Sequence, residues 1–419
     1  MPKKQREGFS QLSRSLRGEI VVSDMLSKLE KVLGWAGEVK IHTAQVQPKG
    51  LPPGEWLDQG VYLCEHSVSL SSRHGKVGLQ NIRGAIKTLA PWGAAEEATL
   101  LDVETTGLAG GTGTYAFMAG VGTIQGETLI VRQLFLTSPQ YESSWLYHLR
   151  RVIPEEVGFV TYNGKRFDIP LLEGRFILNR LPFPERVRGH LDLLYLARSF
   201  WRGVFPSCSL GDVERYALGV ERESQDIPGW LIPELYHAFL TDGDASRLSG
   251  VFYHNYIDIV SLAALKGKLA SLLEGHGKPH EGLKAGDLWA SKGSQEKAFA
   301  LWRKAVEEMA RADEPLKRLA YAHKSAGRYE EAASLFEELL QLEPRSIECL
   351  VELSKVYEHH LKDLDLALAY ARRALQVLME LRPLVWNFKE ERAALLHRVK
   401  RIEEKCARRE RHKEALESS

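Results

Sequence analysis

A pair of carboxylates at the end of a short apolar run limits what this chain can fold into more than any other feature. Asp102 and Glu104 lie two residues apart in the segment LLDVETTGLAGG, residues 100–111. In a strand, side chains at positions i and i+2 point to the same face of the sheet. Two carboxylates on one side of a buried strand are costly unless a cation lies between them. Because Mg²⁺ and Mn²⁺ prefer carboxylate oxygens, the pair indicates a divalent metal site.

The composition indicates a globular protein with no general attraction to nucleic acid. A chain of 419 residues can hold two or three domains, and at a net charge of +1 any such attraction must come from local patches. The four cysteines are far apart in sequence, which excludes a zinc-type spacing and a disulfide framework. The basic N-terminus lacks the apolar region of a secretory signal, and no apolar run is as long as a membrane span. We therefore expect a cytoplasmic protein.

Residues 96–275 alternate between strand and helix patterns and are expected to form one domain. Three strands joined by tight turns are followed by helix, strand, helix and strand, which predicts an α/β mixed sheet with helices on its faces. The expected strands cover residues 98–104, 114–124, 128–136, 158–162 and 189–194, and the expected helices cover 141–152, 170–181 and 253–265. Residues 1–20 are expected to form a basic flexible arm, and residues 21–95 a lead-in region with a helix at 23–33 and a strand at 60–68.

Beyond a polar linker at 276–282, the pattern becomes wholly helical and contains an internal repeat. Ala298 and Ala332 are 34 residues apart, and the best copy of the repeat reads AYAHKSAGRYEEAASLFEELLQLEP, residues 320–344. A 34-residue helix–turn–helix unit of this kind resembles the tetratricopeptide repeat, with a generic helical bundle as the alternative. We expect about three repeats over residues 283–381. The side chains expected to fill the space between paired helices are Tyr329, Phe336 and Leu339.

Residues 382–419 are expected to form a basic C-terminal helix or tail. Between residues 389 and 413 there are ten Lys or Arg residues and five Asp or Glu residues. Two interpretations remain open: a solvated terminal helix, or a tail that attracts nucleic acid.

Two further acidic residues have the right surroundings to complete a metal site. Asp168, in FVTYNGKRFDIPLL, comes just before an apolar helical run, so it is either an N-cap or a ligand. Asp258, in VFYHNYIDIVSLAAL, lies within an apolar helical pattern, one turn after His254 on the same face. Burying this aspartate without a partner is costly, so it is either a metal ligand or half of an ordinary His–Asp surface pair. Asp192 follows a strand-like run and is expected to have a structural role outside the ligand set.

Three motifs follow one another in this chain: Asp-x-Glu-Thr-Thr-Gly-Leu, Tyr-Asn-Gly-x-x-Phe-Asp-Ile-Pro-x-Leu and His-x-x-x-Asp. Together they resemble the motifs of the DEDD superfamily of 3′–5′ exonucleases, which have a ribonuclease H-like fold, and in particular its YprB-like branch. The resemblance covers residues 60–275 and implies a ribonuclease H-like α/β domain followed by an all-α tetratricopeptide-type domain. It also implies two Mg²⁺ or Mn²⁺ ions and a general base. The residues that match the metal ligands are Asp102, Glu104, Asp168 and Asp258, and the residue that matches the base is His254.

The position of the base departs from the family pattern. A histidine base usually lies five residues before the last aspartate, and a tyrosine base four; here His254 is at the four-residue spacing and Tyr253 at the five-residue spacing. We prefer His254 as the general base, because an imidazole has a pKa near neutrality.

The resemblance implies an enzyme, a metal-dependent 3′–5′ exonuclease that hydrolyses phosphodiester bonds of DNA or RNA at a single-stranded 3′ end. The repeats would then bind a protein partner. Two alternatives are a protein-interaction scaffold with a weakly active or inactive nuclease-like domain, and an endonuclease acting on structured nucleic acid.

Two other features near the motifs have both a functional and a structural interpretation. Lys165, Arg166 and Arg175 surround Asp168 in sequence and either contact phosphates or form solvated surface. The glycine-rich loop GLAGGTGT, residues 107–114, lacks the Gly-Lys-Ser/Thr ending of a nucleotide-triphosphate loop. It is either a connector that needs positive φ angles or a loop whose amides approach the terminal nucleotide.

Overall fold

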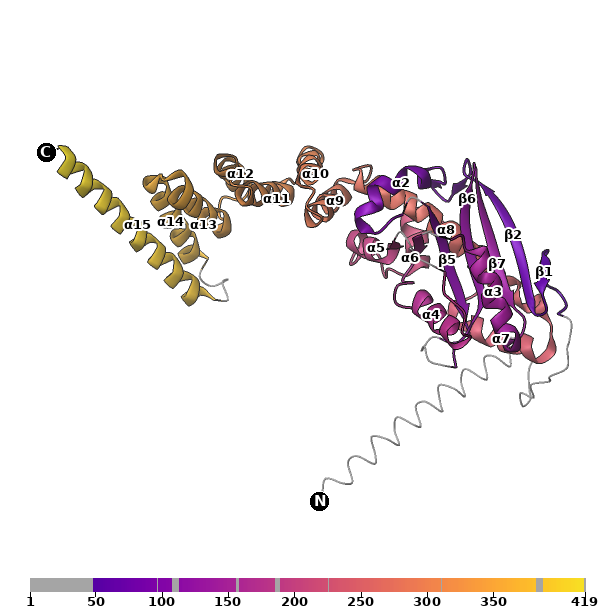
Figure 1. Ribbon diagram of the computed structural model, residues 1–419. Helices are drawn as coiled ribbons and strands as arrows, with labels where there is room; N and C mark the ends of the chain where they lie inside the picture. Colours follow the sequence, from indigo (N-terminus) through magenta and orange to yellow (C-terminus); the bar gives the residue numbers. More distant parts are fainter. Residues whose placement is uncertain are drawn as a thin grey trace, which may run out of the picture.

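The structure consists of a sheet-containing unit from which a row of helices extends (Figure 1). It is a computed structural model, and it describes residues 48–417 except 96, 108–112, 156–157, 185–188, 225, 310 and 382–386. The predicted basic arm, the predicted helix at 23–33 and most of the glycine-rich loop lie outside the described residues.

The main sheet has seven strands in the order β1-β2-β7-β6-β5-β8-β9. They are β1 (Glu55–Asp58), β2 (Val61–Ser69), β5 (Ala98–Thr105), β6 (Ala116–Gln125), β7 (Thr128–Leu136), β8 (Gly158–Thr161) and β9 (His190–Asp192). β8 is parallel to β5 and β9 is parallel to β8, whereas the other neighbours are antiparallel. The predicted mixed sheet is therefore confirmed. A separate two-stranded ribbon contains β3 (Arg73–His74) and β4 (Val77–Gly78).

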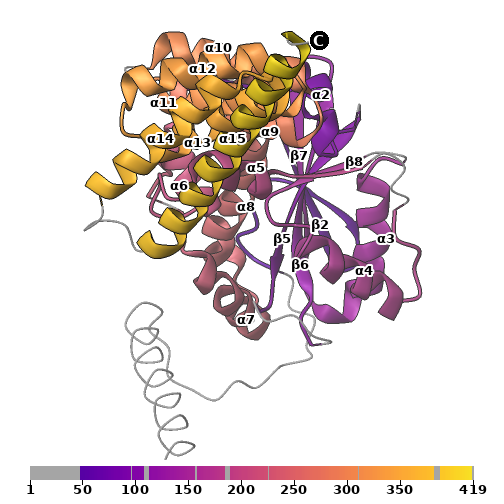
Figure 2. The same ribbon diagram turned by 90° about the vertical axis from the view of Figure 1, so that its left-hand side faces the viewer.

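Helices cover both faces of the sheet (Figure 2). They are α2 (Asn81–Leu89), α3 (Glu142–Val152), α4 (Asp168–Leu178), α5 (Leu193–Trp201), α6 (Leu210–Val213), α7 (Ile232–Asp242) and α8 (Ser249–Leu273). The side chains of α3 and α4 pack in the core on one face, and those of α2, α5 and most of α8 pack in the core on the other. α8 carries apolar side chains around most of its circumference, as expected of a helix buried between the sheet and other helices.

The lead-in region contributes directly to this sheet. All nine residues of β2 pair with β7, from Val61 opposite Leu136 to Ser69 opposite Thr128. α2 packs against α8 on the face of the sheet that also carries α5. The predicted lead-in region at residues 21–95 thus supplies two strands of the main sheet, which begins at Glu55.

The second part of the chain consists of paired helices. They are α9 (Pro279–Ser291), α10 (Gln295–Glu308), α11 (Asp313–Ser325), α12 (Tyr329–Leu342), α13 (Ile347–Val356), α14 (Leu364–Glu380) and α15 (Phe388–Glu417). Phe336 and Leu339 are buried and Tyr329 is half-buried in the core between helices, as predicted. Gly293 and Gly327 have φ values of 77° and 75° at the turns within the first two pairs. Lys362, with a φ of 62°, makes the corresponding turn in the third pair, where glycine is missing.

The junction between the two parts is packed rather than open. The apolar core beneath the sheet continues into α9 and α10. Trp289 donates from Nε1 to the Leu273 carbonyl at 2.8 Å and packs edge-on against Trp92, with ring centroids 5.0 Å apart. Trp201 donates from Nε1 to Glu281 Oε1 at 3.1 Å. The helices on either side of the segment predicted as a linker therefore share a hydrophobic core.

The basic C-terminal segment forms a helix that packs on α14. Arg401 and Lys405 both pair with Glu358, whose side chain is buried, at 2.6 Å and 2.8 Å. Arg409 pairs with Asp365 at 2.8 Å. Part of the positive charge of α15 is therefore neutralised within the protein.

Among the described residues, none of the helices has an apolar stretch long enough to cross a membrane.

We predict that Trp289→Ala destabilises the junction, because it removes a large side chain that is only 4% exposed and leaves a cavity. The expected loss is about 3–5 kcal/mol of unfolding free energy, measured by circular dichroism in urea. Trp230→Ala is the matched control, because Trp230 is 57% exposed and its loss should change stability little. Equal effects of the two substitutions would contradict the packed junction.

Candidate active site

The first two acidic residues project from β5 toward α8. Asp102 Oδ2 accepts a hydrogen bond from Asn255 Nδ2 at 2.9 Å. The charges of His254 and Asp258 shift the pKa of Glu104, so both residues lie near its carboxyl group. The predicted common direction of the two carboxylates is therefore observed. Since all three of these partners lie on α8, this helix faces the acidic pair.

Glycines on β6 let α8 approach the sheet closely. A Cβ atom at Gly120 would lie 2.5 Å from Asn255 Oδ1, and one at Gly122 would lie 2.6 Å from Ile259 Cγ2. Both distances are too short for real contacts, so any larger residue would push the helix away.

A buried amide network fixes the rotation of α8 about its axis. Gln133 on β7 donates from Nε2 to Asn255 Oδ1 at 3.1 Å and to the Phe252 carbonyl at 2.7 Å. Both amide side chains are fully buried. Sequence reasoning missed them, although a glutamine in an apolar strand and an asparagine in an apolar helix are visible signals of buried hydrogen bonding.

Asp168 reaches the site from the start of α4. It is the first residue of the helix, and Phe167 occupies the N-cap position. Burial raises the pKa of the Asp168 carboxyl and the Val103 backbone of β5 opposes this rise, which places this carboxyl beside the strand of the first pair. The N-cap interpretation is therefore not supported, and the carboxylate faces the sheet.

Asp192 has the structural role that was expected. Its carboxylate accepts hydrogen bonds from the amides of Asn163 (2.8 Å), Lys165 (3.2 Å) and Leu194 (3.1 Å). The first two bonds hold the turn between β8 and α4, in which Asn163 has a φ of 67°, and the third caps α5. Asp192 thereby shapes the loop that delivers Asp168.

His254 and Asp258 lie on one face of α8. His254 Nε2 is 3.7 Å from Asp258 Oδ2, and His254 Nδ1 is 2.8 Å from Asp226 Oδ1. The hydroxyl of Tyr253 instead accepts from the Glu223 amide at 3.1 Å. The geometry therefore turns His254, and not Tyr253, toward the acidic residues. Asp226, which sequence reasoning missed, orients the imidazole.

Arg222 is a second residue that sequence reasoning missed. Its guanidinium pairs with Asp258 and with the buried Glu214, donating to Glu214 at 2.6 Å and 2.8 Å. It also lies 3.0 Å from His254 Nδ1. Arg222 therefore places a fixed positive charge beside the acidic group.

Burial raises the pKa values of all four acidic residues, and the charges of nearby carboxylates add to this effect. Burial, followed by the charges of Asp258, Glu104 and Asp168, raises the pKa of Asp102 well above its usual range. Burial is also the main cause that raises the pKa of Glu104 to about 8 and that of Asp168 to about 7. Burial raises the pKa of Asp258 despite the opposing charges of Arg222 and His254. Burial lowers the pKa of His254, but Asp258 and Glu104 outweigh it and raise the pKa overall.

The four carboxylates are the type of ligand that a divalent cation prefers. Their side chains are not arranged around a single ion in this structure. Within the described part of the chain, no three His, Cys, Asp or Glu side chains are spaced to hold a single ion. Arg222 takes one oxygen of Asp258, so a cation would have to displace it or use the other oxygen. Burial raises the pKa values of Asp102 and Glu104, so a bound cation would favour their ionised forms, and hard divalent ions prefer carboxylate oxygens.

The basic residues near Asp168 differ in their availability. Arg175 is buried and donates to Glu142 Oε1 at 2.6 Å and to Glu142 Oε2 at 2.5 Å. Neither of the two interpretations left open for Arg175, phosphate contact or solvated surface, is supported, because its charge is paired within the core. Lys165 and Arg166 are exposed.

Comparisons with known proteins agree with this architecture. Residues 99–270 match the model of the RNase_H superfamily, and residues 313–356 match a tetratricopeptide repeat model. The YprB protein of Bacillus subtilis (strain 168) is 33% identical over 346 residues, which cover 78% of this chain and 83% of the relative.

The chain belongs to the YprB family. The ribonuclease H-like fold and the tetratricopeptide repeat are thus confirmed for this YprB-family protein. The match of residues 99–270 includes all four acidic residues and His254.

We predict that the metal-free protein becomes less stable as the pH rises. Unfolded Asp and Glu ionise at about pH 4, whereas the folded pKa values are about 8 for Glu104 and about 7 for Asp168. Between these limits the folded state binds more protons than the unfolded state, so its stability falls with rising pH. The melting temperature in EDTA should therefore decrease from about pH 5 to about pH 8.

The double variant Asp102→Asn/Glu104→Gln is the control for this measurement. It removes two of the repelling charges, so its melting temperature should decrease less over the same range, and Mn²⁺ should stabilise only the parent protein. If the melting temperatures of parent and variant changed identically with pH, the pKa values of Asp102 and Glu104 would not be raised in the folded protein, and the prediction would be wrong.

Proposed function

We propose that this protein is a 3′–5′ exonuclease that uses two Mg²⁺ or Mn²⁺ ions to hydrolyse phosphodiester bonds at a single-stranded 3′ end of DNA or RNA. The main support is the convergence of four carboxylates, from β5, α4 and α8, beside one imidazole. A buried group of like charges is costly, and a role in catalysis explains why a fold would contain it.

The acidic residues and the histidine have different roles in this mechanism. Asp102, Glu104, Asp168 and Asp258 would hold the ions. When bound, the ions would make water a better nucleophile and stabilise the charge that develops on the phosphate. His254 would accept the proton of the water at Nε2, while its Nδ1 is held 2.8 Å from Asp226 Oδ1 and 3.0 Å from the Arg222 guanidinium.

Two further side chains support the ligands. Asn255 holds the carboxylate of Asp102 toward α8. Arg222 compensates the charge of Asp258 and restrains the loop that carries Asp226. Neither side chain needs to contact the substrate to affect the reaction.

We also propose that the paired helices bind a protein partner. Stacked repeats of this kind present an extended surface formed by neighbouring units. The shared core at α9 would hold such a partner in a defined position relative to the nuclease domain.

Asp102→Asn is expected to lower hydrolysis of a 5′-labelled single strand by at least about a hundredfold with Mn²⁺, because ion-based stabilisation is worth several kcal/mol. DNA and RNA strands are tested in parallel with Mg²⁺, Mn²⁺ or EDTA. Asp365→Asn, which changes an exposed aspartate in the repeats, should leave the rate unchanged. Metal-independent cleavage, or equal rates for the two variants, would refute the proposal. Cleavage of a circular single strand would instead support an endonuclease.

His254→Ala is expected to lower kcat by about 100- to 10,000-fold, the usual range for loss of a general base. Tyr253→Phe is the matched control, because the Tyr253 hydroxyl accepts a hydrogen bond from the Glu223 amide and its loss should have little effect. The kcat of each variant is measured at saturating strand concentration. A larger loss with Tyr253→Phe than with His254→Ala would reverse the assignment of the base.

A further inference from the structure

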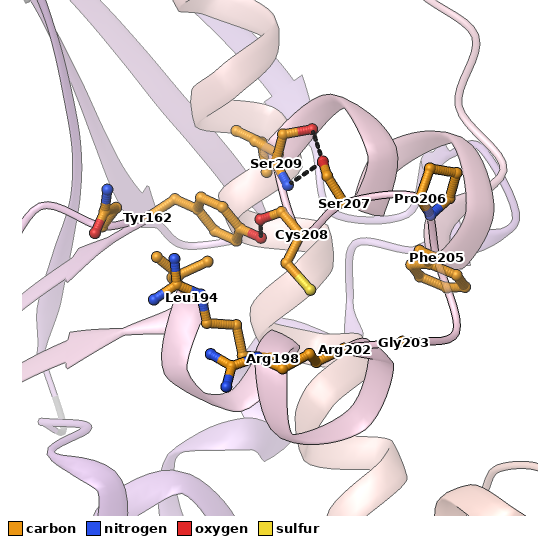
Figure 3. Close-up of a pocket in the computed structure, with 12 residues that line it drawn as sticks. Tyr162, Leu194, Arg198, Arg202, Gly203, Phe205, Pro206, Ser207, Cys208 and Ser209 are labelled. Atoms are coloured by element: carbon orange, nitrogen blue, oxygen red, sulfur yellow. Dashed lines mark hydrogen bonds between the residues drawn. The ribbon is translucent and has the colours of Figure 1, made fainter.

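A cavity of about 590 Å³ opens next to the second sequence motif, outside the acidic group. Its wall includes Tyr162 and Asn163 from the motif, two arginines of the α5 end, and the segment between α5 and α6 (Figure 3). The Tyr162 hydroxyl donates to the Cys208 carbonyl at 2.6 Å, which ties that segment to the end of β8. A volume of this size is within the range of small-ligand sites.

The cavity lies at the same edge of the sheet as the acidic residues. β5 and β8 are parallel, with Leu100 opposite Val160, so Tyr162 is level with Asp102 on the neighbouring strand. Adjacent strands are about 4.8 Å apart. A strand of nucleic acid with its end at the carboxylates could therefore pass into the cavity within one or two nucleotides.

The cavity contains positive charge that the protein does not neutralise. Arg198 is half-buried and Arg202 is exposed, and within the described part of the chain neither guanidinium has an acidic partner. They are four residues apart at the end of α5, where like charges repel each other. Figure 3 shows both side chains extending to the Tyr162 side of the cavity. An anion between them would relieve this repulsion.

Serine hydroxyls are present on the opposite wall. Ser209 Oγ accepts from Ser207 Oγ at 3.1 Å and from the Asp212 amide at 3.2 Å, which leaves its own proton free to donate. Figure 3 places Ser207 and Ser209 across the cavity from the arginines. The walls thus offer two fixed cations and a neutral donor, which suits a phosphodiester group.

We propose that this cavity binds a nucleotide of a single-stranded nucleic acid, with its phosphate held by Arg198 and Arg202. Since the ligand is the substrate strand of the exonuclease proposed above, the site deepens that function. It would hold the strand upstream of the bond that is cleaved. Hydrolysis of a strand too short to reach the cavity would not depend on it.

Binding of the strand is measured without turnover. Fluorescence anisotropy in EDTA with labelled oligothymidylate and oligouridylate compares the parent with Arg198→Ala/Arg202→Ala. We expect at least about tenfold weaker binding, and a salt dependence whose slope is smaller by about 0.7 for each phosphate that the variant no longer neutralises. Arg303→Ala on α10 removes an exposed arginine elsewhere and should bind like the parent. Weaker binding of only one of the two strands would show which of them the cavity accepts.

A second measurement on the unaltered cavity uses Cys208, whose thiol lies at its wall. Cys64 and Cys349 are buried, so in a Cys406→Ser background Cys208 is the cysteine expected to react fastest with a disulfide reagent. A saturating oligonucleotide should slow this reaction several-fold in EDTA. The same protection should be absent in the double arginine variant.

The outcomes separate this site from the proposed reaction. Parent-like binding by the double arginine variant, or an unchanged rate of Cys208 labelling at saturation, would overturn the cavity assignment. Strand binding and Cys208 protection in a protein without any metal-dependent hydrolysis would support the cavity and refute the exonuclease. Metal-dependent hydrolysis by the parent, together with parent-like strand binding by the double arginine variant, would support the exonuclease and refute the cavity assignment.

Discussion

The close approach of α8 to the sheet is the constraint on which the rest of the site depends. Gly120 and Gly122 leave no side chain between β6 and the helix. The helix can then bring Asn255 against Asp102, and one turn later Asp258 lies in the same acidic group. Because the Gln133–Asn255 bond fixes the rotation of α8, the helix presents His254, Asn255 and Asp258 to the carboxylates.

This packing concentrates like charges in a buried place, and the surrounding residues reduce the cost. Arg222 faces Asp258 from a loop, and its second partner, Glu214, is almost completely buried. Such an arrangement stabilises a protein less than apolar packing does, so its presence is best explained by function. The apolar core shared by α8, α9 and α10 supplies compensating stability and also fixes the repeats to the nuclease domain.

Much of the sheet could be predicted because strand patterns are local. The alternation around Asp102 and the turns after Gln125 and Asn163 are properties of a few adjacent residues. The strand at residues 60–68 was predicted, but its place in the sheet could not be, since the pairing of Val61 with Leu136 joins distant segments. For the same reason the charge of Arg175 looked available: its partner, Glu142, comes from another helix.

The sequence by itself determined the element types, the repeat and the identity of the four acidic residues, because spacing and side-chain chemistry carry that information. Tertiary structure decided which groups meet. It brought Arg222 and Asp226 to His254, turned Tyr253 away, and placed the Arg198–Arg202 cavity at the same sheet edge as the carboxylates. These relations depend on contacts between residues far apart in the chain, and side-chain burial and charge pairing there arise only when the helices and the sheet pack together.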